Sequence, residues 1–114
     1  MPERRKRFRK SNLHVTQVVH RDSGQALGRL VNITTEGMLV ITSQSFQKGE
    51  IYPLSVILPR RVADTQVLEC EAEVKWCRPD GNPSYHAVGM QFMNLSHEDI
   101  KIIQEAFNKL SLVR

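Results

Sequence analysis

The 114-residue sequence predicts one mainly β domain, either a small antiparallel barrel or a curled sheet, with a C-terminal helix and a basic N-terminal arm. The length suits a single hydrophobic core. Six short segments of β-type composition are separated by turn residues, and helical spacing follows them. The segments are 13–21, 26–33, 37–43, 51–59, 67–77 and 85–93, and the helix lies in 96–114.

Turn chemistry bounds the first four segments. The first is rich in Val and Thr and ends in Asp-Ser-Gly at 22–24. Thr-Thr-Glu-Gly divides the second from the third, and its Gly37 suits a bend or a bulge. Pro53 stands near the beginning of the fourth segment, which predicts an edge strand or the start of a strand.

The fifth segment alternates between apolar and charged residues. Alternation with a period of two predicts that one face lies on a core and the other in water. The same parity predicts that Trp76 points inward, as tryptophan is usually well buried. The predicted inner residues are Leu68, Cys70, Ala72, Val74 and Trp76, together with Val88, Met90 and Phe92 of the sixth segment, and the predicted outer ones are Glu69, Glu71, Glu73 and Lys75.

The two cysteines, Cys70 and Cys77, both lie in the fifth segment. Their odd spacing places them on opposite faces of a strand, so no disulfide is expected between them. The basic N-terminus has no apolar stretch behind it, and no apolar run approaches the ~20 residues that cross a bilayer. We therefore expect a cytoplasmic protein with no membrane insertion.

The last segment predicts one helix. Ser96, followed three residues later by Asp99, is typical of a helix N-cap. Apolar residues at helical spacing should cover the open end or the side of the strands. These residues are Ile100, Ile103, Phe107 and Leu110.

Positive charge is concentrated in the first ten residues. They hold six of the 16 Lys and Arg residues and one acidic residue, a net charge of +5, whereas the rest of the chain sums to −1. A cationic arm on a nearly neutral body points to an anionic partner. The ordinary alternative is a solvated tail that binds nothing.

The sequence shows no catalytic machinery. No nucleophile, base and orienting group stand at workable spacing, and no phosphate-binding glycine loop or metal-ligand pattern is present. The row of glutamates from 69 to 73 is interpreted as a water-facing strand face. We therefore expect no enzyme activity, no catalytic residue, no metal and no cofactor.

Two short motifs carry the chemistry of a binding site. Arg5 and Arg9 stand at R-x-x-x-R spacing, and arginine pairs with phosphate or with the O6 and N7 edge of guanine and stacks on bases. In Asn-Ile-Thr-Thr-Glu-Gly, Asn32 and Thr34 should emerge on one face, and Gly37 permits close backbone approach or a positive φ angle. Alone, the second motif is also a common turn in which Asn and Thr bond to nearby backbone.

Together the motifs resemble those of the PilZ domain family. Arg5 and Arg9 match its R-x-x-x-R motif, and Asn32, Thr34 and Gly37 match its [DN]-x-S-x-x-G motif, with threonine in place of serine. The hydroxyl is kept, but the added methyl group could crowd a ligand. The resemblance continues in EVKWCR (73–78) and YHAVGMQFMNLS (85–96), so it covers almost the whole chain.

The resemblance implies a six-stranded antiparallel barrel over 13–95, a terminal helix over 96–114 and an arm over 1–12. It also implies that the domain binds cyclic di-GMP, a bacterial second messenger made of two guanosines joined through two phosphates. A downstream protein partner would then receive the signal.

The implied binding residues come from both motifs. Arg5 and Arg9 would contact phosphates and guanines, and Asn32 and Thr34 a guanine or a phosphate, with Gly37 shaping the strand. Arg4 occupies a position where arginine favours a stacked pair of ligand molecules, and Trp76 matches a position where tryptophan in some relatives offers a stacking face.

Two other functions stay open. A small barrel that binds single-stranded nucleic acid would explain the arm, but a body of net charge −1, with seven aromatic residues that do not alternate with basic ones, disfavours it. The other is a PilZ fold that docks on a protein without binding nucleotide, and Thr34 keeps that reading open.

Overall fold

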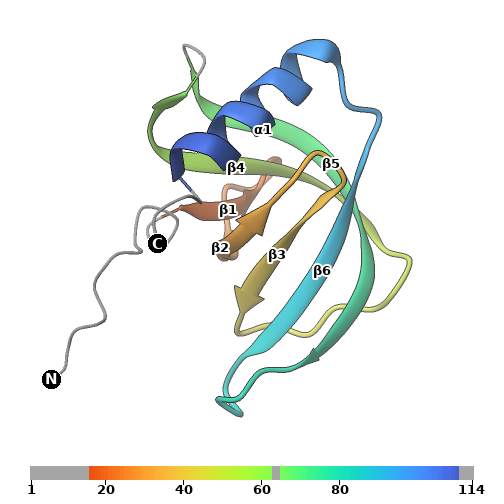
Figure 1. Cartoon of the computed structure of the whole chain (residues 1–114). Helices are drawn as coiled ribbons and strands as arrows, with labels where there is room; N and C mark the ends of the chain where they lie inside the picture. Colours follow the sequence, from red (N-terminus) through yellow and green to blue (C-terminus); the bar gives the residue numbers. More distant parts are fainter. Residues whose placement is uncertain (1–15, 63–64, 111–114) are drawn as a thin grey trace, which may run out of the picture.

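The computed structural model describes residues 16–62 and 65–110, which form a closed six-stranded antiparallel barrel with one helix lying across an end (Figure 1). The predicted barrel is thus confirmed. Around the barrel the strands follow the order β1-β2-β3-β6-β5-β4. The elements are β1 Gln17–His20, β2 Ala26–Ile33, β3 Gly37–Thr42, β4 Ile51–Val62, β5 Thr65–Pro79, β6 His86–Met93 and α1 His97–Leu110.

The core fills the inside of the barrel. Each strand turns alternate side chains inward, because successive Cβ atoms point to opposite faces. The alternation predicted for the fifth and sixth segments is confirmed up to Val74 in β5 and along β6. The buried side chains there are Leu68, Cys70, Ala72, Val74, Val88, Met90 and Phe92, whereas Glu69 and Glu71 are exposed.

Strands β4 and β5 are longer than predicted. They pair as far as Val62 and Thr65, and β5 continues to Pro79, where turn residues were expected. Within β4, the β1–β4 ladder ends at Leu54, so Pro53 lies just beyond it. Proline is tolerated there because its missing N–H falls outside that ladder. The first predicted segment overlaps β1, and residues 13–15 lie outside the described part of the chain.

One extra residue in β5 reverses the parity of the rest of that strand. Val74 pairs with Met90 and Trp76 with the adjacent Gly89, so Lys75 forms a β-bulge. Trp76 therefore faces outward and is 37% exposed. The prediction that Trp76 points into the core was wrong, because simple alternation counts no extra residue.

The same bulge turns Cys77 toward the core. Cys70 is buried and Cys77 is half-buried and packs against the core cluster, so the prediction that they lie on opposite faces was wrong. Both thiols are free.

Helix α1 begins at the predicted cap. The Ser96 Oγ accepts a hydrogen bond from the Asp99 N–H (3.0 Å), and the Asp99 Oδ2 accepts one from the Ser96 N–H (3.1 Å). The helix contacts β2, β4 and β5. Ile103 is fully buried and Ala106 nearly so, but Phe107 is 38% exposed, so the buried stripe is only partly the predicted one. In the part of the chain that the structure describes, no helix has the length and apolar character needed to span a bilayer.

Candidate functional site

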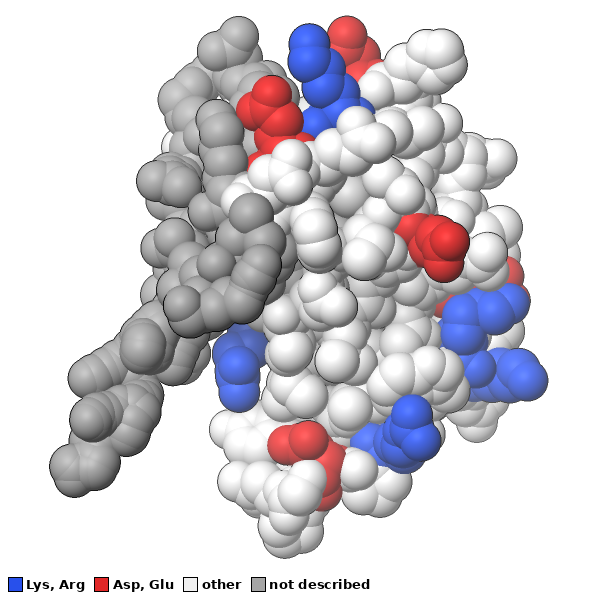
Figure 2. Space-filling model, in the orientation of Figure 1, with Lys and Arg blue, Asp and Glu red and all other residues white. Residues whose placement is uncertain are grey.

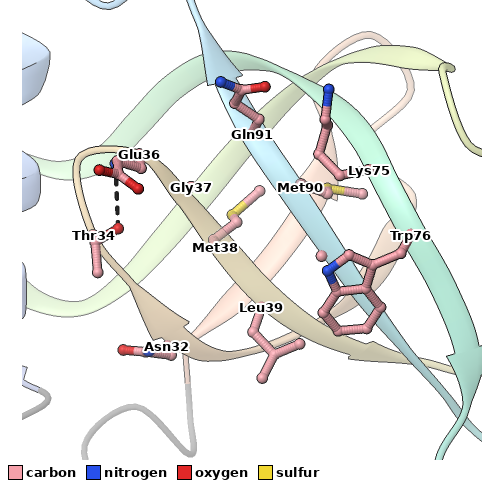
Figure 3. Close-up of a pocket in the computed structure, with 11 residues that line it drawn as sticks. Asn32, Thr34, Glu36, Gly37, Met38, Leu39, Lys75, Trp76, Met90 and Gln91 are labelled. Carbon is pink, nitrogen blue, oxygen red and sulfur yellow. Dashed lines mark hydrogen bonds between the residues drawn. The ribbon is translucent and has the colours of Figure 1, made fainter.

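An open pocket of about 450 Å³ lies on the outside of the barrel, over four neighbouring strands (Figure 3). Strand β2 and the β2–β3 turn form one side, β5 forms the opposite side, and β3 and β6 form the floor. We call it the outer pocket. It is lined by Asn32, Thr34, Glu36, Gly37, Met38, Leu39, Lys75, Trp76, Gly89, Met90 and Gln91.

A bulge in β2 places Asn32 in the outer pocket. The register with β3 shifts between Leu30 and Asn32, so Val31 is the extra residue. Without it, the parity of β2 would turn Asn32 toward the core. Asn32 is instead exposed, and its Oδ1 accepts a hydrogen bond from the Ile33 N–H (2.9 Å).

The turn between β2 and β3 fixes the position of Thr34. The Thr34 N–H donates to the Gly37 carbonyl (2.8 Å), and the Thr34 Oγ1 accepts from the Glu36 N–H (3.2 Å). The Glu36 carbonyl in turn accepts from the Phe92 N–H of β6 (3.0 Å). Asn32 and Thr34 thus make the local bonds of an ordinary turn, and both stay exposed at the outer pocket.

Gly37 lies where β3 and β6 approach closely. It pairs with Gln91, and a Cβ at this position would collide with the Met90 carbonyl oxygen. Its φ lies outside the left-handed region. Of the two alternatives predicted for Gly37, close backbone approach is therefore confirmed, and a positive φ angle was wrong.

The Trp76 indole lies against the backbone of β6. A Cβ at Gly89 would collide with the indole ring, so glycine is what lets the ring rest there. The Arg78 guanidinium carbon lies over the ring, 4.2 Å from its centroid. Such a cation–π contact is worth about 0.5–1 kcal/mol at an exposed site. A flat ligand group that stacks on this face of Trp76 must displace Arg78.

The described part of the outer pocket has little net charge. Lys75 lies on one side, and its Nζ is 3.6 Å from Glu73 Oε2, whereas Glu36 lies on the other side. On the face shown in Figure 2, several Lys and Arg side chains lie near one another at the lower right, and Asp and Glu side chains lie above and below them. Besides Lys75, the Arg78 guanidinium lies at this surface over Trp76, so a ligand with two phosphates would gain from further cations.

The structure brings together only the second motif and Trp76 of the predicted site. Arg4, Arg5 and Arg9 lie outside the described residues. The chain enters the barrel at Thr16, whose carbonyl accepts a hydrogen bond from the Leu30 N–H (2.8 Å). Thr16 thus lies beside β2, close to where that strand reaches the outer pocket.

Other residues of the outer pocket escape sequence reasoning. Lys75 and Gln91 show only the polar side of a strand pattern, and Glu36 occupies a variable position of its motif. A single signal was available: an isolated glycine inside a strand, here Gly89, often marks close approach by another group.

Comparison with known proteins agrees with the fold. A PilZ domain model matches residues 3–109. The chain is similar in structure to the Bacillus subtilis inhibitor of motility (MotI/DgrA), with a TM-score of 0.60 and 22% sequence identity. That similarity covers 82% of this chain and 46% of the other, so the chain spans less than half of that protein's length. Among curated proteins, none matches. Because the family match spans nearly the whole sequence, the chain belongs to the PilZ domain family.

Proposed function

We propose that this domain is a cytoplasmic receptor for cyclic di-GMP, as befits a family of cyclic di-GMP receptors. The ligand occupies the outer pocket, where Asn32 and Thr34 contact a guanine or a phosphate and Trp76 stacks on a guanine. Arg5 and Arg9 of the arm then close over the ligand and pair with its phosphates and guanine edges.

The observation that carries this proposal is the convergence of Asn32, Thr34, Gly37 and Trp76 on the outer pocket. Two β-bulges, at Val31 and Lys75, are needed to bring the polar motif and the indole to the same surface. Hydrogen-bonding groups on one side and an aromatic face on the other suit a nucleotide base.

The charge of the outer pocket explains the need for the arm. Cyclic di-GMP carries two negative charges. The described lining supplies one lysine, already beside a glutamate, and Arg78 lies next to it over Trp76, where a stacked guanine would displace it. The first ten residues carry a net charge of +5. Charge-assisted hydrogen bonds contribute roughly 1.5–3 kcal/mol each, so two or three of them offset the cost of ordering the arm.

The position of Thr16 makes this closure geometrically feasible. Arg9 lies seven residues before Thr16 in the sequence. Seven extended residues reach about 23 Å. From Thr16, which lies one strand spacing before β2, the distance to β5 is four strand spacings, or about 19 Å. The arm is therefore long enough to cross the outer pocket from its attachment beside β2.

Arg4 and the protein partner extend the proposal. A second, stacked ligand would bring four phosphates together, and Arg4 adds a charge that offsets them. The closed arm also changes the surface of the domain, and a downstream protein partner reads that change.

Titration calorimetry with the full chain tests the proposal. We expect saturable binding of cyclic di-GMP, two ligands per chain, and weaker binding of the linear dinucleotide. Arg9→Ala should weaken binding at least tenfold, since it removes at least one charge-assisted hydrogen bond. Lys48→Ala removes the same charge at an exposed position away from the outer pocket and should leave the affinity unchanged.

Four results would count against parts of the proposal. Absence of heat with saturating cyclic di-GMP would remove the receptor function. A stoichiometry of one would remove the role of Arg4 alone. Unchanged affinity in Arg9→Ala would favour a module that docks on protein, and a gel shift with single-stranded nucleic acid that cyclic di-GMP does not compete away would favour the nucleic-acid barrel.

A further inference from the structure

Glu36 is an unexpected residue in a pocket for an anion. It lines the outer pocket beside Thr34, on the side opposite Lys75 and Trp76 (Figure 3). Its side chain is exposed, and among the described residues its carboxylate has no hydrogen bond or ion pair. The Glu36 carboxylate would repel the two phosphates of the ligand. It therefore either weakens ligand binding measurably or makes a favourable contact with another part of the ligand.

The backbone of Glu36 is held in place from two directions. Its N–H donates to Thr34 Oγ1 (3.2 Å), and its carbonyl accepts from the Phe92 N–H of β6 (3.0 Å). The first of these bonds is drawn in Figure 3. The carboxylate is therefore carried by a fixed turn at the rim of the outer pocket, which reduces the ordering cost of a contact with a ligand.

Guanine presents hydrogen-bond donors on one edge and acceptors on another. Its O6 and N7 are the acceptors that arginine recognises. Its N1–H and N2 amine lie on the Watson–Crick edge and both donate, which suits an ionised carboxylate, an acceptor with two oxygens. Adenine has an acceptor at N1 and no amine at C2, so it cannot make this pair.

We propose that the Glu36 carboxylate accepts hydrogen bonds from N1–H and the N2 amine of a guanine and so makes the outer pocket specific for guanine. This inference rests on the proposed binding of cyclic di-GMP. It divides recognition in two: the arm binds phosphates and the O6 and N7 edge, and Glu36 binds the edge that the arm leaves free.

Cyclic di-IMP isolates the Glu36 contact from the arm. Hypoxanthine keeps O6, N7 and N1–H and lacks only the N2 amine, so contacts of the arginines are the same for both ligands. The readout is the ratio of the dissociation constants for cyclic di-IMP and cyclic di-GMP, measured by calorimetry on the full chain. We expect a ratio of about ten in the wild type, as for one charge-assisted hydrogen bond.

Variants of Glu36 give the expected pattern. Glu36→Ala should bring the ratio close to one, and Glu36→Gln, which keeps one carbonyl oxygen, should give an intermediate ratio. Glu69→Ala is the matched control, because Glu69 is an exposed glutamate on the outer face of β5 that does not line the outer pocket. Its ratio should equal that of the wild type.

The failures of the two proposals are distinguishable. A wild type that does not bind cyclic di-GMP overturns the receptor function and this inference with it. A wild type that binds cyclic di-GMP with a ratio near one overturns this inference alone. This inference alone is also overturned if Glu36→Ala has the same ratio as the wild type. That outcome includes the case in which the variant binds both ligands more tightly by the same factor, because repulsion of the phosphates is lost.

Discussion

Gly89 shapes the candidate site because glycine has no side chain. The Trp76 indole rests where a Cβ of residue 89 would stand. The colliding atoms belong to a side chain at the barrel surface, so the indole can swing away while the barrel stays intact. Gly89 therefore determines where the aromatic face lies, rather than whether the strand forms.

We predict that Gly89→Ala weakens cyclic di-GMP binding by roughly five- to 150-fold by displacing the indole, because base–aromatic stacking is worth roughly 1–3 kcal/mol. Calorimetry and thermal melting would measure affinity and stability. Gly81→Ala is the control, since a Cβ added at position 81 would have no atom within 4 Å apart from its chain neighbours. In a Trp76→Ala background, Gly89→Ala should have no further effect on affinity. An equal loss in both backgrounds would contradict this account.

Cys70 gives a prediction for alkaline pH. Burial raises the pKa of its thiol to about 12. An unfolded cysteine has a pKa of about 8.5, so between these values the folded state binds more protons than the unfolded state. Stability should therefore fall as pH rises above about 8.5. Melting temperatures from pH 7 to 10 should decline less steeply in Cys70→Ala than in the wild type; parallel profiles would contradict the assignment.

At the scale of elements, β-type composition and turn residues located the six strands, and period-two alternation predicted the inner residues of β5 and β6, but neither signal located the bulges. Leu68 to Val74 follow the predicted parity, and Trp76 does not, because Lys75 adds one residue. Local sequence barely marks such an insertion: next to Lys75, its one trace is the pair of consecutive apolar residues Trp76 and Cys77. The registers that define a bulge come from pairing with β6, which is a long-range property.

Helix α1 shows the same division between local and long-range information. Its capping box was visible in the sequence because Ser96 and Asp99 bond to each other's backbone. Its buried stripe depends on how the helix lies across the barrel. In the orientation that α1 adopts on the barrel, Ala106 is buried and Phe107 is partly exposed. The helical spacing of the apolar residues alone did not predict this difference.

We predict that Ser96→Ala destabilises the domain by about 1 kcal/mol, the usual cost of losing an N-cap. For a domain of this size the melting temperature should fall by roughly 4–8 °C. Ser45→Ala removes an exposed hydroxyl outside the helix and serves as the control. Affinity for cyclic di-GMP should stay unchanged, because Ser96 does not line the outer pocket. An unchanged melting temperature would contradict the role of the cap.

At the scale of the whole molecule, the barrel supplies a nearly neutral half of the site and the arm supplies the charge. The second motif could be predicted from the sequence because its spacing carries its chemistry. The convergence of Trp76 with Asn32 could not, because it depends on bulges in two strands that are far apart in the chain. The assignment of Arg4, Arg5 and Arg9 stays a prediction.

Hydrogen-exchange mass spectrometry with and without saturating cyclic di-GMP tests the central claim most directly. The account predicts slower exchange on binding in two separate segments, residues 4–10 of the arm and residues 34–37 of the β2–β3 turn. It predicts no such change with the linear dinucleotide at a concentration that does not bind. Equal exchange of both segments with and without cyclic di-GMP, or protection of the arm alone, would contradict closure of the arm over the outer pocket.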